Sequence, residues 1–146
     1  MKRSFTLIEI LVVATIIGLL AAGAAVSYTQ FMKQSRDAKR KTDLEQIRAA
    51  LEMYRSNSDT SSYPVYNPIS VGCITDTGNC STYNIMYLPK VPKDPKDPTY
   101  TYGYSGSSTD YTLGAYLEVT GSSCSTSPPS CTIGNCTYCL GPYGQK

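Results

Sequence analysis

Apolar residues dominate the first quarter of the chain. Residues 5–26 are apolar except for two threonines and Glu9. A helix of about 22 residues is long enough to span the roughly 30 Å hydrocarbon layer of a bilayer. No proline interrupts this segment, and Gly18 and Gly23 are its positions of weakest helix propensity. The pattern predicts a hydrophobic, membrane-spanning helix with two weak points.

A second helical pattern follows without a break. Four apolar residues recur at spacings of three and four, which is the pattern of one buried helix face. These residues are Leu44, Ile47, Leu51 and Tyr54. Polar stop signals begin at Ser56, so we expect one helix over residues 5–56, with residues 27–56 as its amphipathic continuation. Such a helix would measure about 78 Å, and its apolar half must therefore be buried in something other than this chain.

The remaining residues, 57–146, are expected to form a globular head. Prolines punctuate the first part of this region, where residues 85–88 form a short apolar stretch of strand length. Residues 100–104 and 111–119 each show period-two alternation, and a Gly/Ser turn separates them. Two such runs around a turn predict a β-hairpin. An amphipathic helix packed on a small antiparallel sheet is an α+β fold.

Six cysteines lie in the second half of the chain. They are Cys73, Cys80, Cys124, Cys131, Cys136 and Cys139. An even number, confined to the part that a membrane segment would place outside, predicts disulfides formed in an oxidising compartment. The alternative is a zinc site that uses the Cys-x-x-Cys spacing of residues 136 and 139.

Sequence proximity orders the possible disulfides. It favours the pair Cys73–Cys80, which closes a loop after the helix. For the other four, Cys124–Cys131 with Cys136–Cys139 comes first, and the nested pairs Cys124–Cys139 and Cys131–Cys136 are the alternative. Residues 120–146 are rich in Ser, Thr and Gly, so we expect a loop region that is stapled by disulfides and lies on an exposed surface.

Charge and composition argue against several classes of function. Thirteen Lys and Arg against eleven Asp and Glu leave a net charge of +2, which does not indicate a dedicated nucleic-acid binder. With no histidine, no Gly-rich phosphate loop and no close carboxylate pair, we expect no enzymatic activity and no cofactor. The basic residues beyond the apolar run are interpreted as a solvated flank that faces the cytoplasm or lipid headgroups. They are Arg36, Lys39, Arg40 and Lys41.

The N-terminal residues form the most specific motif. Lys2, Arg3 and Ser4 precede Phe5, and Glu9 lies five residues into the apolar run. A carboxylate at this depth in a bilayer is costly and needs a partner. Cleavage between Ser4 and Phe5 would create an α-amino group on Phe5. That amine could pair with Glu9 of a subunit already in place and so set the register of a stack of helices.

This motif, from Arg3 to Glu9, resembles the class III signal of type IV prepilins and type II secretion pseudopilins. The resemblance continues through Tyr63-Pro64 and the Tyr-rich hairpin to about residue 119. In that family, a prepilin peptidase cuts ahead of the Phe and N-methylates it, and the Glu serves in assembly. The resemblance therefore implies cleavage between Ser4 and Phe5, which removes a leader of residues 1–4. It also implies methylation of Phe5 and an assembly role for Glu9.

The resemblance implies a structural subunit of a type IV pilus that serves adhesion, motility or DNA uptake. Its expected partners are copies of itself, the membrane before assembly, prepilin peptidase, the pilus assembly machinery and minor pilins. Its expected location is the inner membrane and then the extracellular pilus, in which the apolar helix forms the core. A major pseudopilin of a type II secretion system is the alternative. A membrane-anchored surface domain that does not polymerise, or an ordinary secretory signal peptide, would leave Glu9 unexplained.

Three features of the chain modify the expectations that the resemblance brings. Ser4 stands where the family usually has Gly before the cleavage site. The apolar stretch lacks the late proline of many pilins, so any melting of the helix on assembly would fall to Gly18 and Gly23. Major pseudopilins hold calcium near their sheet, but too few convergent oxygens are evident here for calcium. Three aspartates near the hairpin are interpreted as acidic turn residues; they are Asp94, Asp97 and Asp110.

Overall fold

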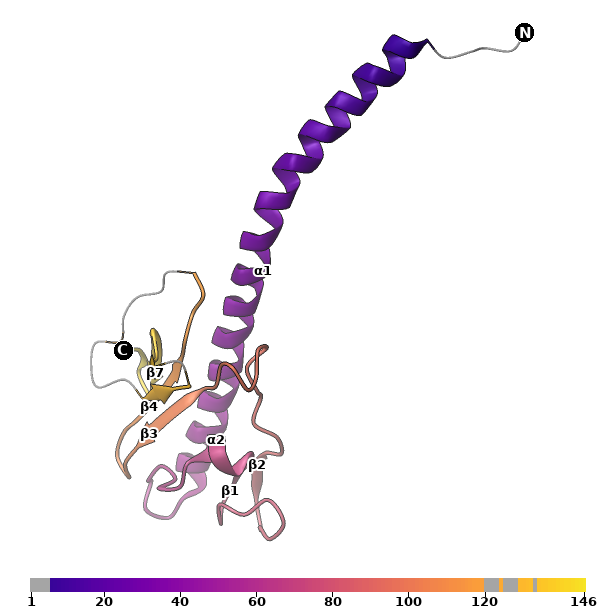
Figure 1. The fold of residues 1–146 in the computed structure, drawn as a ribbon. Coiled ribbons are helices and arrows are strands. Elements are labelled where there is room, and N and C mark those ends of the chain that lie inside the picture. The colour runs from indigo at the N-terminus through magenta and orange to yellow at the C-terminus, as the bar shows by residue number, and fades with distance from the viewer. Residues whose placement is uncertain (1–5, 120–123, 125–128, 133) are drawn as a thin grey trace. The chain divides into compact units, whose positions relative to one another are not determined.

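The computed structural model describes residues 6–119, 124, 129–132 and 134–146. The chain divides into two compact units, of which the first ends at Ser35 and the second runs from Arg36 to Lys146. A single helix, α1, belongs to both units (Figure 1). The second unit also contains the short helix α2 and eight strands among its described residues. The expected α+β architecture is confirmed.

Helix α1 (Leu7–Asn57) is 51 residues long, close to the helix expected over residues 5–56. It contains no proline, and it continues without interruption through Gly18 and Gly23. At its C-terminal end, the Ser58 N–H donates to the Tyr54 carbonyl at 3.0 Å, and the chain then turns. Local propensity is therefore sufficient to explain both the length of the helix and its end.

A four-stranded antiparallel sheet forms the centre of the second unit. Its strand order is β3-β4-β7-β8. The bounds are Gly103–Gly106 for β3, Tyr111–Ala115 for β4, Tyr138–Gly141 for β7 and Gly144–Gln145 for β8. Strands β3 and β4 confirm the expected hairpin, with shorter strands than the alternation suggested. In the register of the inner pair, Leu113 of β4 lies opposite Leu140 of β7.

The C-terminal segment has a different place from the one expected. The interpretation as a stapled loop region on an exposed surface is wrong for β7, because all four of its residues are buried and β4 pairs with it inside the sheet. Tyr138 and Leu140 both belong to the hydrophobic core. Average composition concealed this strand, because only a few apolar residues stand among many polar ones.

Shorter elements surround the sheet. Strand β1 pairs with β2, which confirms the strand expected near residues 85–88, and β5 pairs with β6. Their bounds are Ile74–Thr75 for β1, Met86–Leu88 for β2, Ser130–Cys131 for β5 and Gly134–Asn135 for β6. The one-turn helix α2 (Pro68–Val71) begins at Asn67, whose side chain caps it, and ends at Gly72 with a φ of 88°. This left-handed conformation favours glycine.

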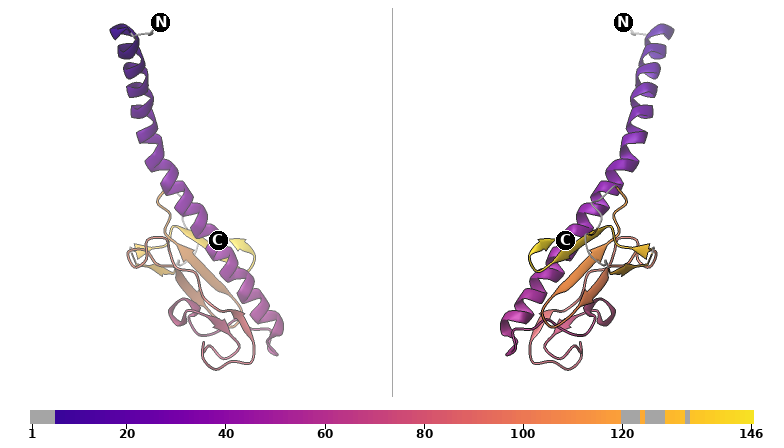
Figure 2. Two further views of the ribbon diagram at one scale, coloured as in Figure 1. Left: turned by 90° about the vertical axis from the view of Figure 1, so that its right-hand side faces the viewer. Right: turned by 90° about the vertical axis from the view of Figure 1, so that its left-hand side faces the viewer.

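The core lies between α1 and the sheet. Leu44, Ile47 and Leu51 of α1 are fully buried, as the helical spacing predicts, and they share one cluster with Leu113 and Leu140. The two views in Figure 2 show the last part of α1 lying along the sheet of the second unit. Burial of these aliphatic side chains contributes about 1.5–3 kcal/mol each.

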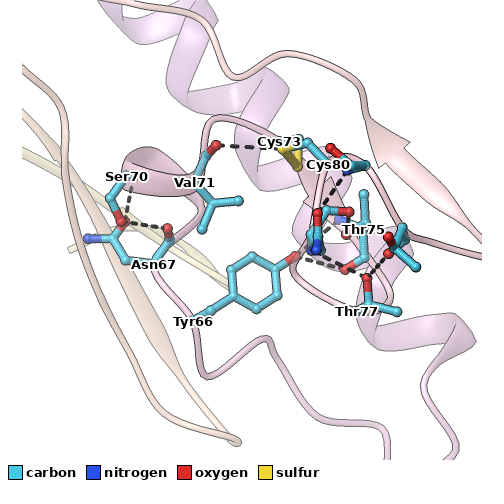
Figure 3. Close-up of a disulfide and its surroundings, with 11 residues drawn as sticks. Tyr66, Asn67, Ser70, Val71, Cys73, Thr75, Thr77 and Cys80 are labelled. Carbon is cyan, nitrogen blue, oxygen red and sulfur yellow. Dashed lines mark hydrogen bonds between the residues drawn. A yellow bond between two sulfur atoms is a disulfide. The ribbon is translucent and has the colours of Figure 1, made fainter.

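The Cys73–Cys80 disulfide is confirmed. It closes a loop that folds around Tyr66 (Figure 3). The Tyr66 hydroxyl donates to the Thr75 carbonyl at 2.8 Å and accepts from the Thr75 N–H at 3.1 Å. A Cβ atom on Gly78 would lie 2.7 Å from the Tyr66 ring, so the loop packs too closely on the tyrosine to admit a side chain there.

The other four cysteines form the nested pairs, Cys124–Cys139 and Cys131–Cys136. The pairing of nearest neighbours is therefore wrong. Successive residues of a strand point to opposite faces, and Cys139 points away from the core that holds Tyr138 and Leu140. There Cys124 reaches it, while the hairpin of β5 and β6 brings Cys131 and Cys136 together. Cys136 and Cys139 thus belong to two disulfides, and they do not form one arm of a zinc site.

Candidate functional site

The N-terminal part of α1 contains the residues that the sequence motif singles out. The cleavage site between Ser4 and Phe5 lies outside the described residues, so processing and methylation stay predictions. Glu9 lies in the first turn of α1. Its carboxylate accepts from the backbone N–H of Thr6 at 3.5 Å and from the Thr6 hydroxyl at 3.4 Å. Both hydrogen bonds are long and therefore weak.

Thr6 and Glu9 form one half of a capping box, in which Glu9 reaches back to the Thr6 N–H while the Glu9 N–H donates to the Thr6 carbonyl at 3.1 Å. In this motif a Thr precedes the helix and a Glu three residues later reaches back to its N–H. The Thr-x-x-Glu spacing is a local signal in the sequence that was not among the expectations. Among the described residues, no cation forms an ion pair with Glu9. The negative charge therefore remains available to a partner outside the chain.

Glu9 stands in a surface that is otherwise apolar. Leu19 and Leu20 are 76% and 70% exposed, and the large apolar side chains from Leu7 to Ile17 are all at least 47% exposed. This segment of α1 is long and apolar enough to cross a membrane. Monomeric soluble proteins rarely expose an apolar surface of this extent. The arrangement requires a second hydrophobic environment, which a bilayer or a bundle of identical helices supplies.

Gly18 and Gly23 lie within this surface. A Cβ atom on either residue would meet no atom within 4 Å. Packing against the described residues therefore does not require glycine at either position. Their expected role as weak points during assembly stays a prediction, because α1 is continuous through both of them.

A buried ion cluster in the second unit joins α1 to two distant segments. It contains three cations and three carboxylates: Arg36, Asp37, Arg40, Asp94, Lys96 and Glu118. Arg40, at 0% exposure, is its centre. Its guanidinium donates to both oxygens of Asp94, at 2.7 and 3.0 Å, and to Asp37 at 2.7 Å. Charge balance within the cluster offsets part of the cost of removing these groups from water.

Glu118 closes the cluster on the side of the sheet. Arg36 donates to both of its carboxylate oxygens at 2.7 Å, and Lys96 donates at 2.8 Å. The hydrogen bonds from Arg36, followed by those from Lys96 and Arg40, hold the pKa of Glu118 well below its ordinary value, although burial acts in the opposite direction. These three cations therefore favour the ionised form of Glu118.

The expectation of a solvated basic flank is wrong for two of its four residues. Arg40 is fully buried and Arg36 is half-buried, whereas Lys39 and Lys41 are exposed. Arg36 and Arg40 pair with Asp94 and Glu118, which lie 54 to 82 residues away in the sequence, and Arg40 also pairs with Asp37, three residues before it. The local signals were this Asp37 spacing and the helical spacing that places Arg40 on the same face as Leu44 and Ile47.

The three aspartates interpreted as acidic turn residues all pair with cations. Asp94 binds Arg40, Asp97 accepts from Lys93 at 3.2 Å, and Asp110 accepts from Lys146 at 2.7 Å. Within the described parts of the chain, no three His, Cys, Asp or Glu side chains gather as a metal site would require. These carboxylates therefore serve contacts inside the chain.

Tyrosine hydroxyls line the polar edge of the core. Tyr63 and Tyr111 both donate to Glu52 at 3.0 Å, and Tyr102 donates to Asp43 at 2.8 Å. Burial raises the pKa of all three phenols. The hydroxyls thus donate to the partly buried Glu52 and to the second oxygen of the buried Asp43, whose first oxygen accepts from Lys39 at 2.6 Å.

Two family models match the chain. Residues 27–119 match the family model described as type II secretion system (T2SS), protein G. Residues 1–25 match the prokaryotic N-terminal methylation motif. No solved structure matches the chain at a comparable level.

Three curated relatives are similar to the chain. The type II secretion system core protein G of Pseudomonas aeruginosa is 36% identical over 121 residues, which cover 78% of this chain and 84% of that protein. The core protein G of Vibrio cholerae is 32% identical over 120 residues, which cover 78% and 81%. The type IV major pilin protein PilA of Myxococcus xanthus is 38% identical over 58 residues. That match covers 40% of this chain and 26% of PilA, so the chain spans about a quarter of this relative's length. The chain therefore belongs to the family of type II secretion system protein G, and it carries the prokaryotic N-terminal methylation motif.

Proposed function

We propose that this chain is a structural subunit that polymerises through α1 into the filament of a type II secretion system. The observation that carries the proposal is the apolar surface of α1 from Leu7 to Leu20, which is exposed along its length and interrupted by a single carboxylate. The protein G family match over the following residues supports the secretion assignment.

The proposed subunit has two successive environments. Before assembly, the apolar segment of α1 lies in the inner membrane. After cleavage ahead of Phe5, the same segment packs among identical helices in the filament. The new α-amino group of an incoming subunit then pairs with Glu9 of its neighbour in a region of low dielectric constant, where the interaction is strong. Prepilin peptidase and an assembly machinery are the partners that this scheme requires, and the role is structural, with no catalytic step.

A type IV pilus is the second candidate. It was the first expectation from the N-terminal motif, and the similarity to PilA over 58 residues favours it. That similarity covers a smaller share of the chain than the protein G relatives do. For this reason the secretion filament takes precedence here.

A deletion strain of the native host, complemented with the full chain, tests the proposal. We expect deletion to abolish export of the host's type II secretion substrates and to leave surface pili intact. Mass spectrometry of the complemented strain should find a chain that starts at Phe5 and carries one additional methyl group. Loss of pili with normal export would favour the second candidate. A chain that retains Met1 would contradict both candidates.

A further inference from the structure

Two carboxylates of the second unit lack the partners that the others have. Among its described residues, seven carboxylates form ion pairs within the chain, and Glu52 accepts from two tyrosine hydroxyls. Asp59 and Asp76 are the two left without a cation or a phenol in the described parts of this unit. Both line the same cavity. The second unit, called the head below, thus pairs nearly all of its described carboxylates, and the two that remain unpaired lie at the same cavity.

The cavity has a volume of about 350 Å³ and two aromatic walls. The rings of Tyr54 and Tyr87 meet edge to face, with their centroids 5.5 Å apart. Asn57, Ser58 and Asn84 are further polar residues of the lining. Carboxylates combined with tyrosine rings favour an ammonium or guanidinium group, which gains both charge-assisted hydrogen bonds and cation–π contacts.

Asp76 is held in position to receive such a group. Its two carboxylate oxygens accept from the backbone N–H of Asn84 at 3.1 and 3.2 Å. Although burial alone would raise the pKa of Asp76, the backbone N–H groups of Asn84 and Ile85 bring this pKa below its ordinary value. The carboxylate is therefore ionised and oriented before any partner arrives.

Among the described residues of the second unit, one lysine has neither an ion pair nor a ring contact, just as Asp59 and Asp76 have no ion pair. Lys90 forms no ion pair and no ring contact with the described residues, whereas the other lysines of this unit do. The backbone on either side of Lys90 is anchored. Leu88 and Val91 are buried, and the Val91 N–H donates to the Gly72 carbonyl at 2.8 Å. Lys90 itself is exposed, so a fixed loop presents its ammonium group to solvent.

We propose that the cavity lined by Asp59 and Asp76 receives the Lys90 ammonium group of a neighbouring subunit. The inference rests on the proposed function, because it needs a polymer of this chain. Lys90 does not line the cavity. In a helical filament each subunit would offer its Lys90 to one neighbour and its cavity to another, which makes the contact heterologous. Such contacts, when they do not close into a ring, generate open helical filaments. The Lys90 contact adds a specific link between heads to the association of the apolar helices.

Cross-linking of wild-type filaments tests this contact directly. A carbodiimide joins a carboxylate to an amine without a spacer, so it reports only groups in direct contact. We expect covalent dimers and higher oligomers on a denaturing gel, and a cross-linked peptide pair that contains Lys90 with Asp59 or Asp76. Lys90→Gln should abolish this product, whereas Lys93→Gln should retain it. The inference would be overturned if the treated filaments gave only monomers on the gel. It would also be overturned if no cross-linked peptide pair contained Lys90.

A charge exchange supplies an independent measurement. Asp59→Lys and Lys90→Asp should each lower filament yield by about tenfold, the scale expected for a directly contacting charge pair. The double variant restores complementary charges and should recover most of the yield. Glu45→Lys reverses an exposed carboxylate outside the cavity and should have little effect. A double variant as deficient as the single ones would contradict the proposed contact.

The two proposals fail in different ways. If the wild-type chain forms no filament at all, the proposed function is wrong. If wild-type filaments form and their subunits show no cross-link at Lys90, only the contact between heads is wrong.

Discussion

Arg40 carries a positive charge into the interior of the head. Taking a guanidinium out of water costs several kcal/mol, and the attraction of nearby carboxylates offsets this cost only when the geometry is good. Here the guanidinium forms a two-bond contact with Asp94 and further bonds to Asp37 and Glu118. Its planar fork of donors matches this arrangement, and the point charge of lysine does not.

Arg40→Ala should destabilise the head by about 3–5 kcal/mol, because it leaves Asp94 and its neighbours buried without their cation. Arg40→Lys should recover only part of this loss. Urea unfolding of the full chain in detergent micelles, followed by near-UV circular dichroism, measures the change. Lys41→Ala is the matched control, because Lys41 is exposed and its contact with the Tyr138 ring is worth about 0.5–1 kcal/mol at an exposed site. Equal effects of Arg40→Ala and Lys41→Ala would show that the buried ion cluster does not stabilise the head.

The loss of folding stability at acidic pH should depend on Glu118. Its pKa in the folded state lies below its ordinary value, so its contribution to stability is complete above about pH 4.3 and is lost as the pH falls further. Unfolding measured from pH 7 to pH 3 should therefore show a steep loss of stability. Glu118→Gln should be less stable at pH 7 and should lose less in acid. An unchanged acid profile in this variant would contradict the role of Glu118.

At the scale of elements, β7 connects the C-terminal segment to the core. It pairs with β4 on one side and β8 on the other, and its two faces serve different purposes. One face adds Tyr138 and Leu140 to the core, and the other places Cys139 in the disulfide cluster. The strand has apolar surface to bury on one side and a covalent link on the other. Hydrophobic burial and a disulfide therefore both fix the position of β7.

Gly114 of β4 lies opposite Cys139 in this sheet. A Cβ atom there would lie 2.5 Å from the Cys136 sulfur and 2.8 Å from the Pro129 ring. Gly114→Ala should therefore push the disulfide cluster away from the sheet and destabilise the head by about 1–3 kcal/mol. Thermal unfolding measures the loss. Ser105→Ala, at an exposed position of the neighbouring strand β3, should change stability by less than about 0.5 kcal/mol. A Gly114→Ala variant as stable as this control would show that the cluster adapts without cost.

At the scale of the whole molecule, the two units meet different requirements. The second unit satisfies most of its polar and apolar groups internally, whereas the apolar surface of the first unit remains exposed. The apolar surface of the first unit can be buried in a membrane or in a polymer of the chain. The capping contact between Thr6 and Glu9 uses only part of the hydrogen-bonding capacity of the carboxylate.

Glu9→Ala should separate membrane insertion from assembly. The variant loses the proposed charge partner of the Phe5 amine, so subunits should accumulate in the membrane while filament yield falls at least tenfold. Cleavage between Ser4 and Phe5 should be retained, because that junction is unchanged. Immunoblots of membrane and filament fractions, with mass spectrometry of the N-terminus, provide the measurement. Glu9→Gln keeps the capping hydrogen bond and removes the charge. Filament yield near normal from Glu9→Gln would indicate that Glu9 acts through the helix cap alone.

The sequence by itself determined the features that depend on local periodicity. The length of α1, its buried face at Leu44, Ile47 and Leu51, the central hairpin and the short Cys73–Cys80 loop follow from residues close together in the chain. The exposed carboxylate of Glu9 in an apolar helix was also evident, because spacing and polarity alone define it. These features need no information about distant segments.

Only the tertiary structure decided the features that join distant segments. The burial of Arg40 depends on Asp94 and Glu118, which lie 54 and 78 residues further along the chain. The nested disulfides depend on the face of β7 to which Cys139 points, and that face depends on the pairing of β7 with β4. The residues next to a charged side chain or a cysteine in the sequence do not show which distant residue will contact it in the fold. Its environment is therefore determined by packing across the fold.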